Sequence, residues 1–245
     1  MEKDYEHRYH NLELANWWFV GRRHALLTLL EAFPKNARIL EMGCSGGALL
    51  LDLKMRGFTD AEGLDISPEA IKVCRQRGLD NVTLASAEQS GKESNFFDVI
   101  IASDILEHIA DEAATLREWA RILKPGGTLI LFVPAFHILW SGHDLVNHHM
   151  RRYRRKPLTD LIRHHGFVIV KSSYWNFLLF FPTLLFRLIG RLFASRREPR
   201  PHLFPVPRFV NATLIALLKA ENYFLLRLGI SYPLGVSVFA LARKK

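Results

Sequence analysis

The stretch Ile39-Leu-Glu-Met-Gly-Cys-Ser-Gly-Gly47 decides how this chain folds. Its apolar start predicts a buried strand, its glycines predict a tight turn, and Ala48-Leu-Leu-Leu-Asp-Leu predicts a following helix. Further on, Gly63-Leu-Asp65 predicts a second short strand that ends in an acid. In a doubly wound sheet, an acid roughly 20 residues after such a turn is typical of a nucleoside site. Glycines let the backbone approach a ligand closely, and a carboxylate can accept both hydrogen bonds of a ribose diol.

Glu41, at the end of the first predicted strand, narrows the identity of the ligand. A dinucleotide site would carry Gly-x-Gly-x-x-Gly, with the pyrophosphate at the helix N-terminus. An acid at position 41 would repel a pyrophosphate but suits a ligand that carries an ammonium or sulfonium charge. The pattern Glu41-x-Gly-Cys-x-x-Gly47 resembles the first motif of class I S-adenosylmethionine (SAM) methyltransferases. The middle glycine of that family's motif is Ser45 in this chain.

Three further motifs extend this resemblance over residues 37–135. They are similar to the third strand with its adenine-contacting end, to the fourth strand with the motif after it, and to the turn before the fifth strand: Val82 to Glu88, Phe97 to Ile109, and Leu123-Lys-Pro-Gly-Gly127. They occur in the family's order, separated by helix-length segments. The resemblance implies an α/β fold with a doubly wound, Rossmann-like sheet of seven strands, the last of them antiparallel.

The resemblance also implies SAM as the cofactor, S-adenosyl-L-homocysteine as the product, and a set of residues that hold them. We expect Asp65 to bind the ribose hydroxyls and Glu41 to lie near the methionine end. The Ala87 backbone and Glu88 are expected to meet the adenine edge. The full set lies at or just after the ends of the first four strands: Glu41, Gly43, Cys44, Ser45, Gly47, Asp65, Ile66, Ala87, Glu88, Ser103, Asp104 and His108.

A metal site after the fourth strand is the alternative use of Asp104, Glu107 and His108. In the quinone-biosynthesis O-methyltransferases that the chain resembles here, a similar Glu-His can hold a divalent metal. Glu-His is also widespread in the wider family without metal, and a helix start favours acids because of the helix dipole. We therefore assign no metal ligand from the sequence and expect Glu107 and His108 to border the methionine end of the cofactor.

Length and composition indicate a single enzyme-sized α/β domain. A chain of 245 residues can bury one large core. Its only cysteines, Cys44 and Cys74, imply no disulfide framework and fit a reducing compartment. No apolar stretch follows the first charged residues, which argues against a secretory signal peptide. These features predict a cytoplasmic protein, with peripheral contact to the inner membrane face left open.

Positive charge is concentrated in one part of the sequence. Residues 151–200 contain 12 of the 33 Lys and Arg residues but only two acids, Asp160 and Glu198, so the formal charge of +9 is a local feature. Such a run fits a solvated face, a funnel for an anionic substrate, a nucleic-acid footprint or a membrane-surface patch. We set nucleic acid aside because the run is compact and no nucleic-acid-binding module accompanies it.

The basic run follows the fifth predicted strand, where ligands of open α/β sheets bind and where the resemblance implies acceptor contacts. Six residues there are candidates for catalysis and acceptor binding: His143, His148, His149, Arg151, Arg152 and Tyr153. Arginines would position a carboxylate acceptor without a base, whereas a histidine would remove the proton of a hydroxyl, phenol or ammonium acceptor. The sequence leaves both chemistries open.

We expect methyl transfer to an oxygen or nitrogen of an anionic or carboxylate-bearing acceptor, either free or on a peptide or lipid carrier. Exposed arginines are expected to steer that acceptor to the site: Arg151, Arg152, Arg154 and Arg155. A non-catalytic partner subunit that binds SAM or a nucleoside is the alternative.

The segment Asn16-Trp-Trp-Phe-Val-Gly-Arg-Arg23 is similar to the amino-terminal cover of related methyltransferases. Arg22 or Arg23 could pair with the cofactor carboxylate. For each of them, an exposed salt bridge to another residue is an equally good interpretation.

We divide the chain into a helical cover (1–34), a SAM-binding methyltransferase domain (35–173 and 234–245) and a helical insert (174–233). The insert separates two strands that a short link ordinarily joins in this family. Its first apolar run, Phe177 to Phe186, is shorter than the about 20 residues that span a bilayer, and charges interrupt the second. We interpret the insert as a lid or dimer surface, with an interfacial membrane anchor as the third alternative. The protein is expected to be a monomer or a homodimer, and to bind SAM without the insert.

Overall fold

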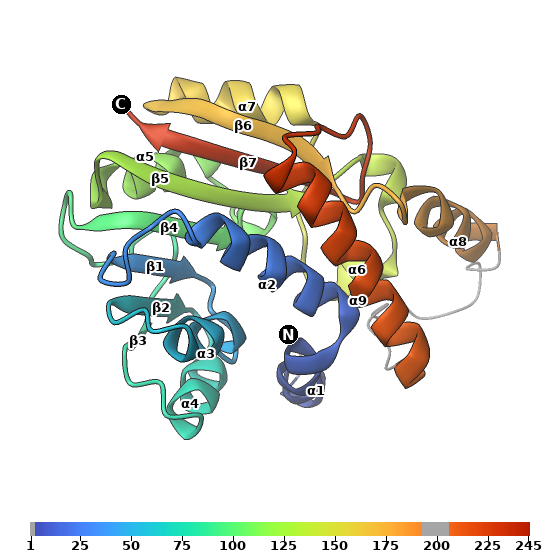
Figure 1. The fold of residues 1–245 in the computed structure, drawn as a ribbon, viewed down its shortest axis with the longest axis horizontal. Coiled ribbons are helices and arrows are strands. Elements are labelled where there is room, and N and C mark those ends of the chain that lie inside the picture. The colour runs from blue at the N-terminus through green and yellow to red at the C-terminus, as the bar shows by residue number, and fades with distance from the viewer. Residues whose placement is uncertain (1–2, 193–205) are drawn as a thin grey trace.

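The computed structural model describes residues 3–192 and 206–245. At its centre lies a seven-stranded sheet with the order β3-β2-β1-β4-β5-β7-β6 (Figure 1). The strands from β3 to β5 pair in parallel, and β7 is antiparallel to both of its neighbours. The strand bounds are β1 (Ile39–Met42), β2 (Ala61–Asp65), β3 (Val82–Leu84), β4 (Phe97–Ser103), β5 (Leu123–Pro134), β6 (Phe167–Trp175) and β7 (Ser237–Lys244). The predicted fold class is confirmed.

Helices cover both faces of the sheet (Figure 1). The core on one face includes residues of α2 (Trp17–Leu30), α3 (Ala48–Met55), α4 (Pro68–Gln76) and α9 (Arg208–Asn222). The core on the other face includes residues of α5 (Glu112–Ile122) and α7 (Arg155–His164). Alternate residues of β4 point into the two cores, so this strand is apolar throughout its centre.

Six further elements complete the described part of the chain. They are α1 (Lys3–Ala15), η1 (Leu106–His108), η2 (His137–Leu139), α6 (Gly142–Val146), α8 (Phe180–Leu192) and the π-helical turn η3 (Tyr223–Arg227). The turn predicted at Leu123-Lys-Pro-Gly-Gly127 lies inside β5. The register moves from Phe97 opposite Leu123 to Val99 opposite Thr128, so the additional residues bulge out of the ladder.

The described part of the segment between β6 and β7 is mainly helical, as predicted. It forms α8, α9 and η3, whereas the proline-rich part from 193 to 205 lies outside the described residues. Helix α9 packs against α2, and a Cβ on Gly21 would lie 2.4 Å from Leu218 Cδ1. Asn222 Nδ2 also donates to the Gly21 carbonyl at 2.9 Å. The insert therefore packs directly on the amino-terminal cover.

One helical stretch in the described part of the chain, Arg208–Arg227, could cross a membrane by length and composition alone. It has 20 residues and a mean hydropathy of 1.2, and 22% of its apolar window is buried. Its carboxyl-terminal end carries Glu221, a buried acid that accepts hydrogen bonds from the backbone N–H groups of Phe177 and Leu178 at 3.0 and 3.2 Å. These contacts join the carboxyl-terminal part of the stretch to the segment that follows β6.

Candidate functional site

The glycine-rich turn between β1 and α3 has the backbone shape that a close ligand approach requires. Gly43 and Gly47 have φ angles of +68° and +80°. Ser45, which replaces the family's middle glycine, also has a positive φ of +51°. Serine therefore occupies the left-handed conformation that glycine favours, and the turn keeps its shape at a modest energetic cost.

Asp65, at the end of β2, is attached to this turn. Its Oδ2 atom accepts a hydrogen bond from the Ser45 N–H at 2.9 Å, and Oδ1 accepts one from the Ser67 N–H at 2.9 Å. The next residue, Ile66, is 76% exposed beside this polar group. A carboxylate and an exposed apolar side chain thus lie together where the ribose and adenine of the predicted cofactor are expected.

Glu41 provides a buried carboxyl group in β1, just before the turn. Its side chain is almost fully buried, and its Oε2 atom has no hydrogen-bond partner. Burial, followed by the nearby Glu13 carboxylate, raises the pKa of Glu41 well above its usual range. An unpaired buried carboxyl group is stabilised by an incoming cation, and the cofactor offers an ammonium and a sulfonium group.

Helix α1 lies over the same turn. Glu13 pairs with Arg77 at 2.5 Å, and Arg77 Nη1 donates to the Gly46 carbonyl at 2.6 Å. His10 Nδ1 lies 3.1 Å from Ser45 Oγ. The amino-terminal cover therefore contacts the backbone that is predicted to hold the cofactor.

Arg22 joins the cover to the end of β4. Its Nη1 atom donates to Ser103 Oγ and to Asp104 Oδ2, each at 3.0 Å. The guanidinium is buried and lies within 5.2 Å of three ring centroids, those of Trp18, Phe132 and Trp175. Burial lowers the pKa of Arg22, although Asp104 opposes this shift. Of the two arginines considered for the cofactor carboxylate, Arg22 is thus the one fixed beside predicted cofactor residues, whereas Arg23 pairs with Asp52 at 2.8 Å.

The predicted adenine-edge residues follow β3 at the same edge of the sheet. The Ala87 carbonyl accepts a hydrogen bond from Trp119 Nε1 at 3.0 Å. The exposed Glu88 donates its backbone N–H to Ser86 Oγ at 3.1 Å. Ala87 is thus held by Trp119 of α5 and Glu88 by a local hydrogen bond, and Glu88 is exposed to solvent.

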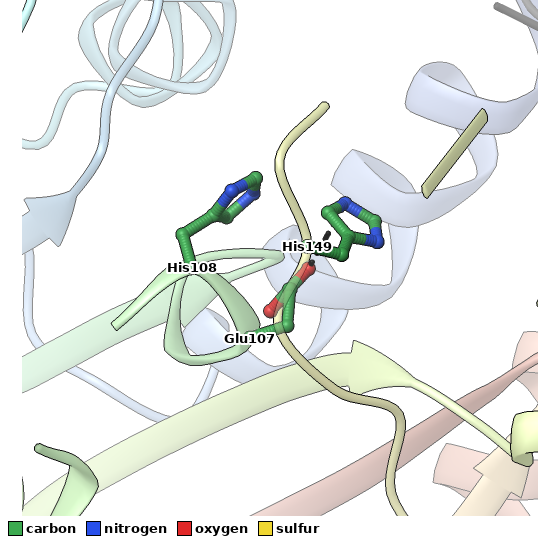
Figure 2. A group of neighbouring side chains, drawn as sticks. All are labelled: Glu107, His108 and His149. Atoms are coloured by element: carbon green, nitrogen blue, oxygen red, sulfur yellow. Dashed lines mark ion pairs between the residues drawn. The ribbon is translucent and has the colours of Figure 1, made fainter. Parts of the chain in front are cut away.

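Three ionisable side chains meet where the chain leaves β4 and where the loop after α6 passes over it. Figure 2 shows Glu107 and His108 next to His149. One ligand-type atom from each of them lies within 4.8 Å of the others. His149 Nε2 is 4.0 Å from Glu107 Oε1, and the two imidazole centroids are 4.7 Å apart. Glu107 is fully buried, and neither of its carboxyl oxygens has a hydrogen-bond partner.

Asp144 fixes the orientation of His149. This buried acid accepts hydrogen bonds from His149 Nδ1 at 2.9 Å, from Arg152 Nε at 2.7 Å and from the Ser141 N–H at 2.8 Å. Burial alone would raise the pKa of Asp144, but His149 and Arg152 hold it well below its usual range. In the neutral imidazole this hydrogen bond places the proton on Nδ1, so the lone pair is on Nε2, the atom 4.0 Å from Glu107 Oε1.

The other two members of this group are held in their neutral forms. Burial, followed by the Asp104 carboxylate, raises the pKa of Glu107 well above its usual range. Burial and the neighbouring His149 lower the pKa of His108 to about 4. Near neutral pH the group therefore contains a carboxylic acid and an uncharged imidazole beside His149.

Of the six residues predicted for catalysis, the described structure brings only His149 into this group. The expectation that Arg152 is an exposed steering cation is wrong, because its side chain is 2% exposed and is paired with Asp144. Arg151 pairs with Glu112, and Tyr153 Oη donates to the same carboxylate at 2.6 Å. Burial, followed by Glu112, raises the pKa of Tyr153, so this phenol stays protonated.

The two remaining candidates lie on either side of His149 in sequence. His143, in α6, has its Nδ1 atom 3.2 Å from Asn147 Nδ2. His148 has a positive φ of +55°, in the tight connection that leads to His149. Sequence reasoning missed Asp144, although Ser141-x-x-Asp144 has the spacing of a capping box, and the structure forms that box.

The donor set of Glu107, His108 and His149 fits a divalent metal ion. One carboxylate and two imidazoles are ligands that zinc and related metals accept, and the Glu107 oxygens have no other partner. No metal ligand was assigned from the sequence, because Glu-His is widespread in the family without metal; the position of His149 beside Glu107 is an observation of the structure. An ion held by these residues would supply Lewis-acid activation of an acceptor oxygen.

Comparisons with known proteins give matches in sequence and in fold. A family model described as a methyltransferase domain matches residues 10–172. The ubiquinone biosynthesis O-methyltransferase of Xanthomonas oryzae pv. oryzae (strain PXO99A) is 38% identical over 105 residues, which are 39% of this chain and 42% of that protein. The matched region thus spans less than half the length of this curated relative.

Solved structures show the same fold at low sequence identity. A SAM-dependent methyltransferase from Archaeoglobus fulgidus superposes with a TM-score of 0.59 at 18% identity, covering 97% of this chain and 99% of that one. Phosphoethanolamine N-methyltransferase 2 from Haemonchus contortus, solved in complex with SAM, gives a TM-score of 0.56 at 17% identity. That match covers 90% of this chain and 52% of the other.

Proposed function

Since the chain belongs to the SAM-dependent methyltransferase family, as its motifs predicted, we propose that it transfers the methyl group of SAM to an acceptor oxygen. In this proposal His149 acts as the general base. The observation that carries it is the Asp144–His149 hydrogen bond of 2.9 Å, which in the neutral imidazole places the lone pair on Nε2, 4.0 Å from Glu107 Oε1. The name of the Xanthomonas relative, an O-methyltransferase, supports oxygen as the target atom.

In this proposal the cofactor binds at the carboxyl ends of β1, β2 and β4. Asp65 would accept the ribose hydroxyls, and Ile66 would pack against the adenine. The buried Glu41 carboxyl would face the positively charged methionine end, where its missing partner is supplied. Arg22, fixed by Ser103 and Asp104, is the cation placed nearest the β4 end for the cofactor carboxylate.

Methyl transfer requires alignment more than activation, because the sulfonium already makes the methyl group electrophilic. The protein must hold the acceptor oxygen in line with the S–CH3 bond and exclude water. A hydroxyl acceptor must also lose its proton, and an imidazole is well matched to that task near neutral pH. His149 Nε2 would take this proton, and Asp144 would stabilise the imidazolium that forms.

An anionic or carboxylate-bearing acceptor remains part of the proposal. Arg154 is exposed, and Arg155 is half-buried at the start of α7. Neither arginine belongs to the buried network around Asp144. These two side chains could attract an anionic acceptor, since charges near the surface raise the rate at which an oppositely charged molecule reaches the site. Raising the salt concentration to about 0.5 M should therefore increase the acceptor KM, because screening at that ionic strength shortens the Debye length well below 10 Å.

Replacement of His149 tests the proposal. Protein and cell extract are incubated with isotope-labelled SAM, and the methylated acceptor is identified by untargeted mass spectrometry. The His149→Gln variant should then lower kcat at least about a hundredfold while S-adenosyl-L-homocysteine binds with unchanged affinity in calorimetry. His164→Gln, at an exposed position on α7, is the matched control and should retain full activity.

Two outcomes would overturn the proposal in different ways. Full activity of His149→Gln would exclude His149 as the base but leave methyl transfer intact. Binding of SAM without incorporation of label into any compound of the extract would favour the non-catalytic, SAM-binding partner subunit.

A further inference from the structure

The outer side of α8 presents large apolar side chains to solvent. Phe181 and Leu185 are 61% and 60% exposed, and Leu188 and Ile189 are also exposed. Positions 181, 185, 188 and 189 share one side of an α-helix because they recur at intervals of three and four residues. Exposed apolar surface of this kind on one helix indicates an interaction site.

The inner side of α8 is firmly attached to the domain, so the orientation of the outer side is fixed. Phe180 is buried in a small cluster with Leu139 and Val236. Arg187 donates to the Leu139 carbonyl, and Arg191 donates to the carbonyls of Ile138 and Trp140 at 2.7 and 2.8 Å. In Figure 1, α8 lies at the end of the molecule toward which the parallel strands point, the end that carries the site.

Charge near α8 in the sequence is strongly positive. Helix α8 has no acidic residue. Arg187 is buried and does not count toward the surface charge, but from position 188 to 208 the sequence has one acid, Glu198, and five arginines: Arg191, Arg196, Arg197, Arg200 and Arg208. An apolar helix side that adjoins arginines and lacks acids is the pattern of helices that lie in the interface of an anionic bilayer.

We infer that α8 docks on the surface of an anionic lipid bilayer, with Phe181 and Leu185 inserted among the lipid head groups. Helix α8 has 13 residues, too few for the about 20 needed to cross a bilayer, so it lies along the surface. A second copy of the chain is a poorer occupant, because the sequence that follows α8 is rich in arginine and poor in acids, and two such segments would repel each other. An anionic bilayer is complementary in both charge and polarity.

Vesicle flotation of the full chain tests this inference without knowledge of the methyl acceptor. The protein should float with phosphatidylcholine vesicles that contain phosphatidylglycerol, and much less with pure phosphatidylcholine vesicles. Phe181→Glu/Leu185→Glu should weaken binding to the anionic vesicles at least about tenfold. Val168→Glu changes an exposed apolar residue on β6 and is the matched control that should bind like the unchanged protein.

Calorimetry with S-adenosyl-L-homocysteine checks that each variant is folded. As a second measurement, a polarity-sensitive dye on Ile189→Cys should shift to the blue when anionic vesicles are added. Failure of the unchanged protein to float with anionic vesicles would overturn the inference. So would a dimer in sedimentation that the Phe181→Glu/Leu185→Glu change dissociates, because the outer side of α8 would then be a subunit interface.

Discussion

Replacing Asp144 by Asn should destabilise the protein and slow catalysis together. The substitution removes the negative charge that pairs with Arg152 at 2.7 Å and lies 3.9 Å from Arg187. The side chains of these arginines are only 2% and 8% exposed, so water cannot replace the lost partner. Breaking a buried ion pair from one side costs about 3–5 kcal/mol in the free energy of unfolding. Because His149 loses its acceptor, kcat should also fall at least about tenfold.

Urea unfolding followed by tryptophan fluorescence measures the change in stability. Asp160→Asn is a suitable control, because Asp160 pairs with Lys156 and Arg163 at the surface and its loss should leave the unfolding midpoint nearly unchanged. The double variant Asp144→Asn/Arg152→Met should lose less stability than the sum of the two single variants, since it removes both members of the pair. A coupling of at least about 1 kcal/mol is expected for such a contact.

The reasoning about Asp144 fails if Asp144→Asn unfolds within about 1 kcal/mol of the unchanged protein, since a buried uncompensated guanidinium is not compatible with so small a loss. Only the catalytic role of Asp144 is refuted if the variant is destabilised as expected but keeps its kcat and pH profile. In that case Asp144 would stabilise the loop without setting the tautomer of His149.

Three further predictions follow from the site. Asp65→Ala should weaken SAM binding at least about tenfold in calorimetry because a charged acceptor of two hydrogen bonds is lost, and unchanged affinity in a folded variant would contradict the ribose assignment. The His108 pKa of about 4 in the folded chain lies below the usual 6.5. The unfolded chain therefore binds this proton first as the pH falls, and stability should drop by up to about 3 kcal/mol between pH 6.5 and 4. His108→Gln should flatten this slope in urea unfolding. With His149 as base, exhaustive chelation should leave kcat unchanged, whereas lost activity that a divalent cation restores would identify Glu107, His108 and His149 as ligands.

The fold was predictable because its signals are local and ordered. Most of the motifs mark the end of a strand, as Glu41 does on β1 and Asp65 on β2, and the apolar runs between helices predicted the remaining strands. The shape of the glycine-rich turn also followed, although Ser45 departs from the family's motif. A left-handed serine is tolerated because the surrounding turn determines the backbone, and Asp65 accepts its N–H.

The acceptor site was only partly predictable, because its contacts join positions far apart in sequence. Nothing local places His149 beside Glu107, since the approach depends on how the loop after β5 folds back over η1. The charge count was misleading for a related reason. Arg152 and Arg187 contribute to the basic segment, yet both are buried around one acid, Asp144, and the sequence does not distinguish such cations from exposed ones.

The insert is joined to the site more closely than its place between β6 and β7 suggested. Arg187 reaches from α8 to the Leu139 carbonyl and toward Asp144, while burial and the neighbouring Arg152 lower its pKa to about 9. Helix α9 and η3 contribute Leu218 and Leu225 to the core beneath α2, the helix that carries Arg22. Removing the whole insert would therefore expose this core and disturb the cover, so retained SAM binding in a deletion variant is no longer the expected outcome. Point substitutions on the outer side of α8 leave both connections intact, and they alone can separate the surface role of the insert from its part in the site.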